Sequence, residues 1–162
     1  MISRGELMLG KINWSVTTIL AIGWVVLVGA LAQDVVVQRR RQMESNNSLV
    51  AEALNKAVKE KNFLEIENKC NVIQENMNKV LDFFPRGSLS KNSRAKPEIW
   101  AQWSEFTKHP AIVTKAAQEL GAAAKAGDLA LVEDKFKALG EACKACHSSF
   151  RAPKPMVEEE FR

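Results

Sequence analysis

The sequence predicts an all-α protein: an antiparallel up-down-up-down four-helix bundle preceded by a hydrophobic N-terminal segment. Apolar residues recur at helical spacing over four stretches, and strict alternation typical of a strand is found nowhere. One segment rich in Pro, Gly, Ser and Asn separates the second stretch from the third. At 162 residues, the chain is long enough for one core of this kind.

The N-terminal segment has the composition of an export signal. A basic head is followed by the uncharged run WSVTTILAIGWVVLVG and then by the small-residue exit ALA. This order is typical of a signal peptide over residues 1–32, with cleavage between Ala32 and Gln33. The alternative is an uncleaved membrane anchor, because residues 12–31 are just long enough to span a bilayer. Under both interpretations the rest of the chain leaves the cytoplasm.

The predicted bundle domain occupies residues 33–153, and residues 154–162 form a C-terminal tail. Its first two helices are indicated by apolar positions spaced three, four or seven residues apart. These positions are Val36, Met43, Val50, Leu54 and Ala57 in the first helix, and Ile66, Cys70, Ile73, Met77, Val80 and Phe84 in the second.

The main loop is predicted over Phe83 to Pro97, and two further helices follow it. Pro110 should kink or locally break the third helix, because proline lacks the backbone N–H that a helix interior needs. Gly127 and Asp128 end the third stripe, and Asp128 is a good N-cap for the fourth helix. The two stripes are Trp103, Phe106, Val113, Ala117, Leu120 and Ala124, then Val132, Phe136, Leu139, Cys143, Cys146 and Phe150.

The charge pattern excludes one class of partner. The formal net charge is +4, and the basic residues are interspersed with acidic ones. A nucleic-acid binder would gather its Lys and Arg residues in a single stripe. We therefore expect no nucleic-acid partner.

The stretch CKACH, which contains Cys143, Cys146 and His147, carries the strongest chemical signal. On a helix, offsets of three and four residues bring the three side chains to one face. C-x-x-C-H is the attachment signature of haem c, in which two thiols bind the vinyl groups and the imidazole reaches the iron. A structural zinc site would need a second ligand pair, and a thioredoxin-like site would need a strand before its helix. A plain disulfide is the remaining alternative.

The sequence around this motif resembles the class II c-type cytochromes, the cytochrome c-prime family, over Gln33 to Pro153. The resemblance rests on CKACHSSFR at the C-terminal end of the bundle, with FFP after the second helix and KPEIW at the start of the third. It implies one covalent haem c, thioether bonds at Cys143 and Cys146, and His147 as the proximal iron ligand.

The start of the bundle, QDVVVQRRRQMESNN, is similar to a low-spin subgroup of that family. The similarity implies that Met43 is the second axial ligand, whereas a Met on an apolar helix face is more often core. Met77 is a rival ligand, although its position suits packing equally well. Arg39 lies one turn before Met43, and the resemblance places it near a haem propionate. The alternative is that Arg39 belongs to a solvated basic face.

The resulting hypothesis is a periplasmic monohaem cytochrome that carries one electron between redox partner proteins and is not an enzyme. No acid–base pair accompanies Met43 on the inward stripe, as a peroxidase-like site would require. The alternative is a five-coordinate or Met-displaceable protein that binds nitric oxide or carbon monoxide. The resemblance allows a homodimer through the first two helices, and an uncleaved anchor would make the protein a membrane-attached subunit facing the periplasm.

Overall fold

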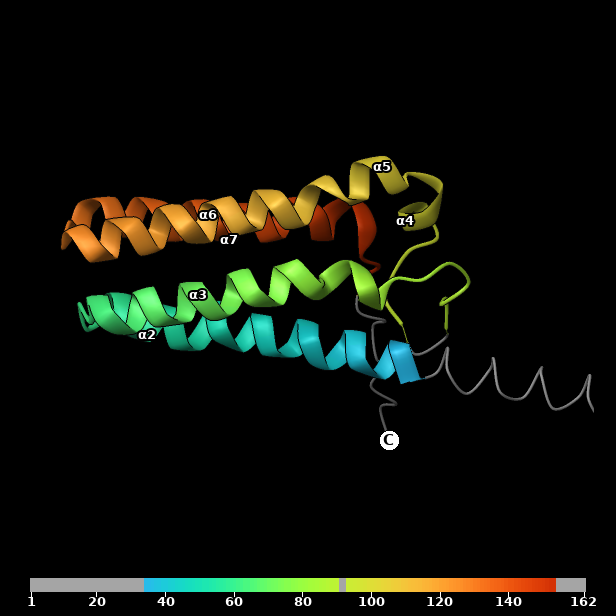
Figure 1. Cartoon of the computed structure of the whole chain (residues 1–162), viewed down its shortest axis with the longest axis horizontal. Helices are drawn as coiled ribbons and strands as arrows, with labels where there is room; N and C mark the ends of the chain where they lie inside the picture. The colour runs from blue at the N-terminus through green and yellow to red at the C-terminus, as the bar shows by residue number, and fades with distance from the viewer. Residues whose placement is uncertain (1–33, 91–92, 154–162) are drawn as a thin grey trace, which may run out of the picture.

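The computed structural model describes residues 34–90 and 93–153, which form an elongated antiparallel bundle (Figure 1). The predicted signal or anchor segment and the C-terminal tail lie outside the described residues. Within the described part, no helix is both long enough and apolar enough to cross a membrane. The predicted four-helix bundle is confirmed.

Residues 34–48 are helical, and this first helix runs without a break to Lys59. Its middle is a π-helical segment, η1 (Leu49–Leu54), and its last part is α2 (Asn55–Lys59). A turn at Lys61, which has a φ of 56°, leads into the second helix. The π segment shifts the helical register, so that the inward positions before and after it do not follow one straight stripe.

The second helix consists of α3 (Phe63–Lys79) and a 3₁₀ extension, η2 (Val80–Phe83). The Asn62 side chain caps its start by accepting a hydrogen bond from the Glu65 amide at 3.1 Å. This bond satisfies one of the amides that a helix N-terminus leaves without an intrahelical partner.

The third predicted helix is divided into α4 (Glu98–Ala101), α5 (Trp103–Phe106) and α6 (Lys108–Ala126). Pro110 lies in the first turn of α6, where its missing N–H has no intrahelical acceptor to lose. The predicted local break is therefore confirmed, and it falls just before the proline.

The fourth helix, α7 (Leu129–Phe150), follows a tight turn. Gly127 ends α6 in the left-handed conformation with a φ of 70°, which favours glycine. Asp128 then caps α7 by accepting a hydrogen bond from the Leu131 amide at 3.0 Å. The predicted N-cap is confirmed.

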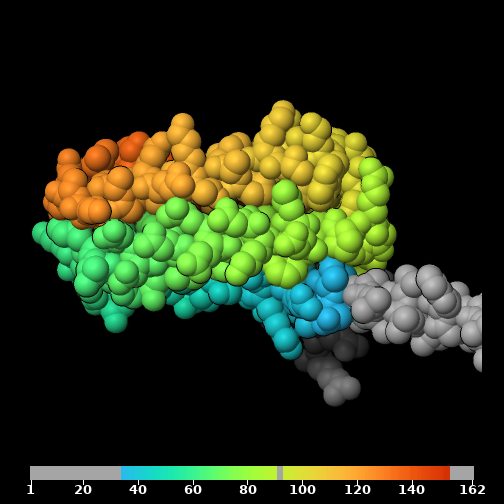
Figure 2. All heavy atoms as spheres, in the orientation of Figure 1, coloured from blue at the N-terminus to red at the C-terminus, as the bar shows by residue number. Residues whose placement is uncertain are grey.

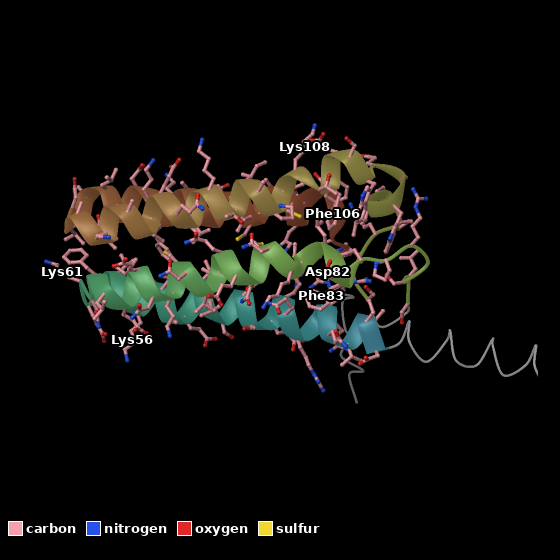
Figure 3. All side chains as sticks on the ribbon, in the orientation of Figure 1. Lys56, Lys61, Asp82, Phe83, Phe106 and Lys108 are labelled. Atoms are coloured by element: carbon pink, nitrogen blue, oxygen red, sulfur yellow. The ribbon has the colours of Figure 1, made fainter. Side chains whose placement is uncertain are left out.

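The core lies between two helix layers that pack against each other along the visible face (Figure 2). α6 is the central element of the packing, because it contacts both α3 and α7. Phe106 points between the layers, whereas Lys56 and Lys108 point away from them (Figure 3). The largest fully buried apolar side chains are Leu54, Ile66, Ile73, Ile99, Leu120, Leu139, Val36, Val132 and Cys70.

Candidate functional site

The motif residues lie in the last two turns of α7, as the sequence predicts. Cys143, Cys146 and His147 are all partly buried, and both thiols are free of any disulfide. Cys143 and Cys146 pack against the main core cluster. Because one helix carries all three side chains at offsets of three and four residues, they share one face.

Burial keeps these groups uncharged. It raises the pKa of the Cys143 thiol, and burial followed by the neighbouring Cys143 raises the pKa of Cys146 to about 11. Burial, followed by the positive charges of Arg151 and Arg94, lowers the pKa of His147. At neutral pH the His147 ring is therefore neutral and keeps the nitrogen lone pair that an iron ligand requires.

The main loop holds the C-terminal end of α7. The backbone amide of Lys96 donates to the carbonyl of Phe150 at 3.0 Å, and its ammonium donates to that of Ser149 at 3.0 Å. The Arg94 guanidinium donates to the carbonyl of Ala152 at 2.9 Å from Nε and at 2.6 Å from Nη2. These bonds satisfy carbonyls that a helix end leaves without intrahelical partners, and they fix the turn that carries His147.

An aromatic cluster packs beside this turn. The Phe150 ring meets Phe106 edge-on at 5.3 Å between centroids and meets His109 at 5.5 Å. The Nδ1 atom of His109 is buried and has no hydrogen-bond partner. His109 does not belong to the apolar pattern of the third predicted helix, so its place in this cluster was not predicted.

Met43 lies on the inner side of the first helix and is partly buried. It packs against the same core cluster as Cys143 and Cys146, so the fold directs the first helix and the motif to one core. Its role as an iron ligand stays a prediction. The rival Met77 is buried in the core on α3, as its stripe position indicated.

Arg39 is buried, with only 4% of its surface exposed, so it does not belong to a solvated basic face. Its Nε donates to the Phe83 carbonyl at 2.8 Å, and its Nη1 donates to the Ser93 hydroxyl at 3.0 Å. Its Nη2 donates to both the carbonyl and the hydroxyl oxygen of Ser88. Arg39 therefore ties the first helix to the main loop, and the predicted contact with a propionate stays a prediction.

Two aromatic rings flank the Arg39 guanidinium, at 4.3 Å for Phe84 and 5.8 Å for Trp100. Trp100 in turn donates through Nε1 to the carbonyls of Phe84 and Pro85, both at 3.1 Å. Burial lowers the pKa of Arg39 to about 10, so the group stays cationic at neutral pH. Within the described residues this buried cation forms no ion pair with a carboxylate.

The donor set fits a covalent haem. A porphyrin supplies four nitrogen ligands itself, so two free thiols and one neutral imidazole on one helix face are the protein groups that its attachment needs. Among the described residues, no three His, Cys, Asp or Glu side chains gather as a structural metal site would require. The fold and the motif together define a four-helix-bundle c-type cytochrome.

The family model described as Cytochrome C' matches residues 34–151. The chain therefore belongs to the cytochrome c′ family, whose members carry covalently attached haem c. This result confirms the family and the cofactor that the sequence predicts, whereas its low-spin subgroup stays a prediction.

Individual relatives agree with the family. The cytochrome c' of Rhodospirillum rubrum is 40% identical over 70 residues, or 43% of this chain and 48% of that protein. The match thus spans about half the length of this relative. The nitric oxide complex of a mutant cytochrome c prime from Alcaligenes xylosoxidans has a TM-score of 0.68 and 26% identity, covering 76% of this chain and 97% of the other. A carbon-monoxide-bound variant of that protein has a TM-score of 0.67, 26% identity and coverages of 75% and 97%.

Proposed function

We propose that this protein is a periplasmic electron carrier in which His147 and Met43 hold the haem iron. The observation that carries the proposal is the arrangement around one core of two free thiols, a neutral imidazole and a partly buried thioether. We propose a non-enzymatic role in which this arrangement holds the cofactor, with redox proteins as partners.

When bound, the haem supplies a one-electron couple between ferric and ferrous iron. The protein's residues then have separate tasks. Cys143 and Cys146 would fix the porphyrin covalently, and His147 would provide a neutral nitrogen at the helix end that the loop–α7 hydrogen bonds hold. A Met43 thioether ligand would favour the ferrous state and raise the reduction potential.

A second candidate function is the binding of nitric oxide or carbon monoxide at the position that Met43 would otherwise occupy. It is favoured by the structural relatives described above, which carry these two gases in their complexes. Both candidate functions use the same cofactor and His147 as an iron ligand. They differ in whether a gas can replace Met43 at the iron.

The visible spectrum of the reduced holoprotein, recorded before and after addition of carbon monoxide, separates the two functions. We expect sharp low-spin bands that the gas leaves unchanged, because Met43 occupies the sixth position. Met43→Ala should convert the protein to a form whose bands shift with the gas, while Met77→Leu serves as the control and should leave them unchanged. A broad spectrum that shifts in the unsubstituted protein would contradict Met43 ligation and support the gas-binding function.

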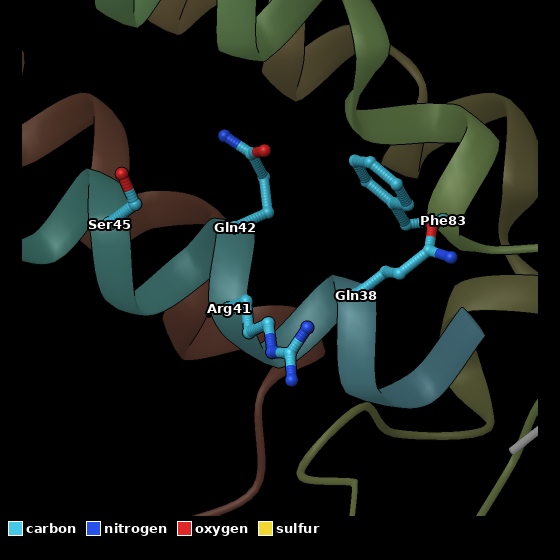
Figure 4. A pocket seen from close by; sticks show the side chains of 5 residues that line it. All are labelled: Gln38, Arg41, Gln42, Ser45 and Phe83. Atoms are coloured by element: carbon cyan, nitrogen blue, oxygen red, sulfur yellow. The ribbon is translucent and has the colours of Figure 1, made fainter. Parts of the chain in front are cut away.

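We further propose that a homodimer forms through the first two helices. A surface hollow of about 350 Å³ lies there, lined by Gln38, Arg41, Gln42, Ser45 and Phe83 (Figure 4). The exposed apolar side chains Val37 and Val72 also lie on the first helix and on α3. This mixture of polar and apolar side chains suits a protein–protein interface.

A further inference from the structure

An amide in the first helix has an unmet hydrogen-bonding capacity. The side-chain oxygen of Asn46 accepts a hydrogen bond from Asn76 Nδ2 of α3 at 2.7 Å. The side-chain nitrogen of Asn46 is buried and has no partner within the described structure. A buried donor without an acceptor is costly, and such groups are rare unless a partner completes them.

The position of this amide points to the partner. Asn46 comes three residues after Met43, and residues at this spacing are neighbours on one face of a helix. Because Asn76 occupies the oxygen of this amide, the N–H groups of Asn46 need an acceptor other than Asn76. The donor therefore lies one helical turn from Met43, and Met43 packs against the same core cluster as Cys143 and Cys146.

We propose that Asn46 is a positioning residue that donates its free N–H to the ligand in the sixth position of the iron. This inference rests on the proposed function, in which that ligand is the Met43 sulfur or a gas in its place. Asn76 acts through Asn46, because its hydrogen bond to the carbonyl oxygen fixes the direction of the donor.

The chemistry of such a bond sets the direction of its effect. Donation to the thioether sulfur withdraws electron density that would otherwise stabilise ferric iron, so the bond raises the reduction potential. Donation to a bound diatomic gas slows its release, because one more interaction must break. If Asn46 had only a structural role, its replacement would change the stability of the fold but neither the reduction potential nor the rate of gas release.

The test compares holoproteins carrying Asn46→Leu, which removes the polar atoms, with the parent and with Asn47→Leu. Asn47 is the matched control, because it is the next residue and is exposed. Spectroelectrochemical titration should show a lower midpoint potential for Asn46→Leu and an unchanged potential for Asn47→Leu. In a Met43→Ala background, Asn46→Leu should release nitric oxide about fivefold faster, the loss expected for one hydrogen bond of typical strength. Asn76→Ala should change both quantities in the same direction by a smaller amount.

The inference is overturned if both the potential and the nitric oxide release rate match those of the Asn47 control. Asn46→Ala is measured in the same way, so a folding failure of the leucine variant does not remove the test. A parent protein without a haem spectrum would refute the proposed function itself, which distinguishes that failure from an unaffected Asn46 variant in a normal haem protein.

Discussion

The Arg39 guanidinium joins the first helix to the main loop. The side chain is buried and donates hydrogen bonds to Phe83, Ser88 and Ser93. Its hydrogen-bond partners Ser88 and Ser93 lie about fifty residues away, in a loop without periodicity. No spacing rule connects a helix to such a loop, so these contacts could not be predicted from the sequence.

We expect Arg39→Met to lower the free energy of unfolding by about 2–4 kcal/mol, because it removes several hydrogen bonds and leaves buried loop oxygens unpaired. Arg40→Met is the matched control: Arg40 is exposed, and its ion pair with exposed Glu44 at 3.8 Å is of a kind that contributes little, so its change should be close to zero. Urea unfolding followed by circular dichroism measures both. Equal losses in the two variants would contradict the anchoring role of Arg39.

Cys70 predicts a specific pH dependence. Burial, followed by the charge of Glu67, raises the pKa of its thiol to about 12 in the folded protein, from 9.0. The folded state therefore holds this proton more tightly than the unfolded state. The associated stability is complete below pH 9.0 and decreases as the pH rises toward 12, by about 1.4 kcal/mol per pH unit.

Urea unfolding of the parent and of Cys70→Ala at pH 8 and pH 10 tests this dependence. The alanine variant keeps the other titrating groups, so it should lose less stability between the two pH values than the parent. If the parent and the variant lose the same stability, the Cys70 thiol does not titrate as its burial implies.

At the scale of elements, the predictable features were those with local causes. The four apolar stripes, the Asp128 cap and the break near Pro110 each follow from residue types at short spacing, and all are present. The π segment Leu49–Leu54 was not predicted, because its residues fit an α-helical stripe equally well. The further division between α4 and α5 falls at Gln102, which is neither proline nor glycine, so no local residue type predicts it.

Removing the N-cap of α7 should measurably lower the free energy of unfolding. We expect Asp128→Ala to lower the free energy of unfolding by about 1 kcal/mol, because the Leu131 amide loses its acceptor. Glu133→Ala is the control, since Glu133 is exposed in the same helix and caps nothing. Thermal unfolding should show a lower stability for Asp128→Ala than for Glu133→Ala. An equal loss of stability in the two variants would contradict the capping role of Asp128.

At the scale of the whole molecule, the motif and the bundle together identify the family and its cofactor. The order Cys143, Cys146, His147 was decisive because it encodes attachment chemistry directly. The surroundings of Met43, the proposed second axial ligand, could be predicted less well from the sequence. The free donor of Asn46 depends on its pairing with Asn76 across two helices, and a single chain without its fold cannot show which polar residues face each other.

The intact mass of the exported protein tests processing and attachment together. We expect a chain that begins at Gln33 and carries one haem. The sequence holds three cysteines, of which two form thioethers, so unfolding should expose one alkylatable thiol, Cys70. A chain that still begins at Met1 would show that the anchor is kept, and three alkylatable thiols would contradict covalent attachment.

The hydrogen bonds from Arg94 and Lys96 to the end of α7 have a consequence for folding. These bonds join residues more than fifty positions apart, so they form only after a long loop closes. In the folded chain the Cys143 and Cys146 thiols are partly buried, and burial raises their pKa values, which makes them weaker nucleophiles than exposed thiols. We therefore expect the folded chain without haem to react more slowly with a thiol-specific reagent at these two cysteines than the unfolded chain does.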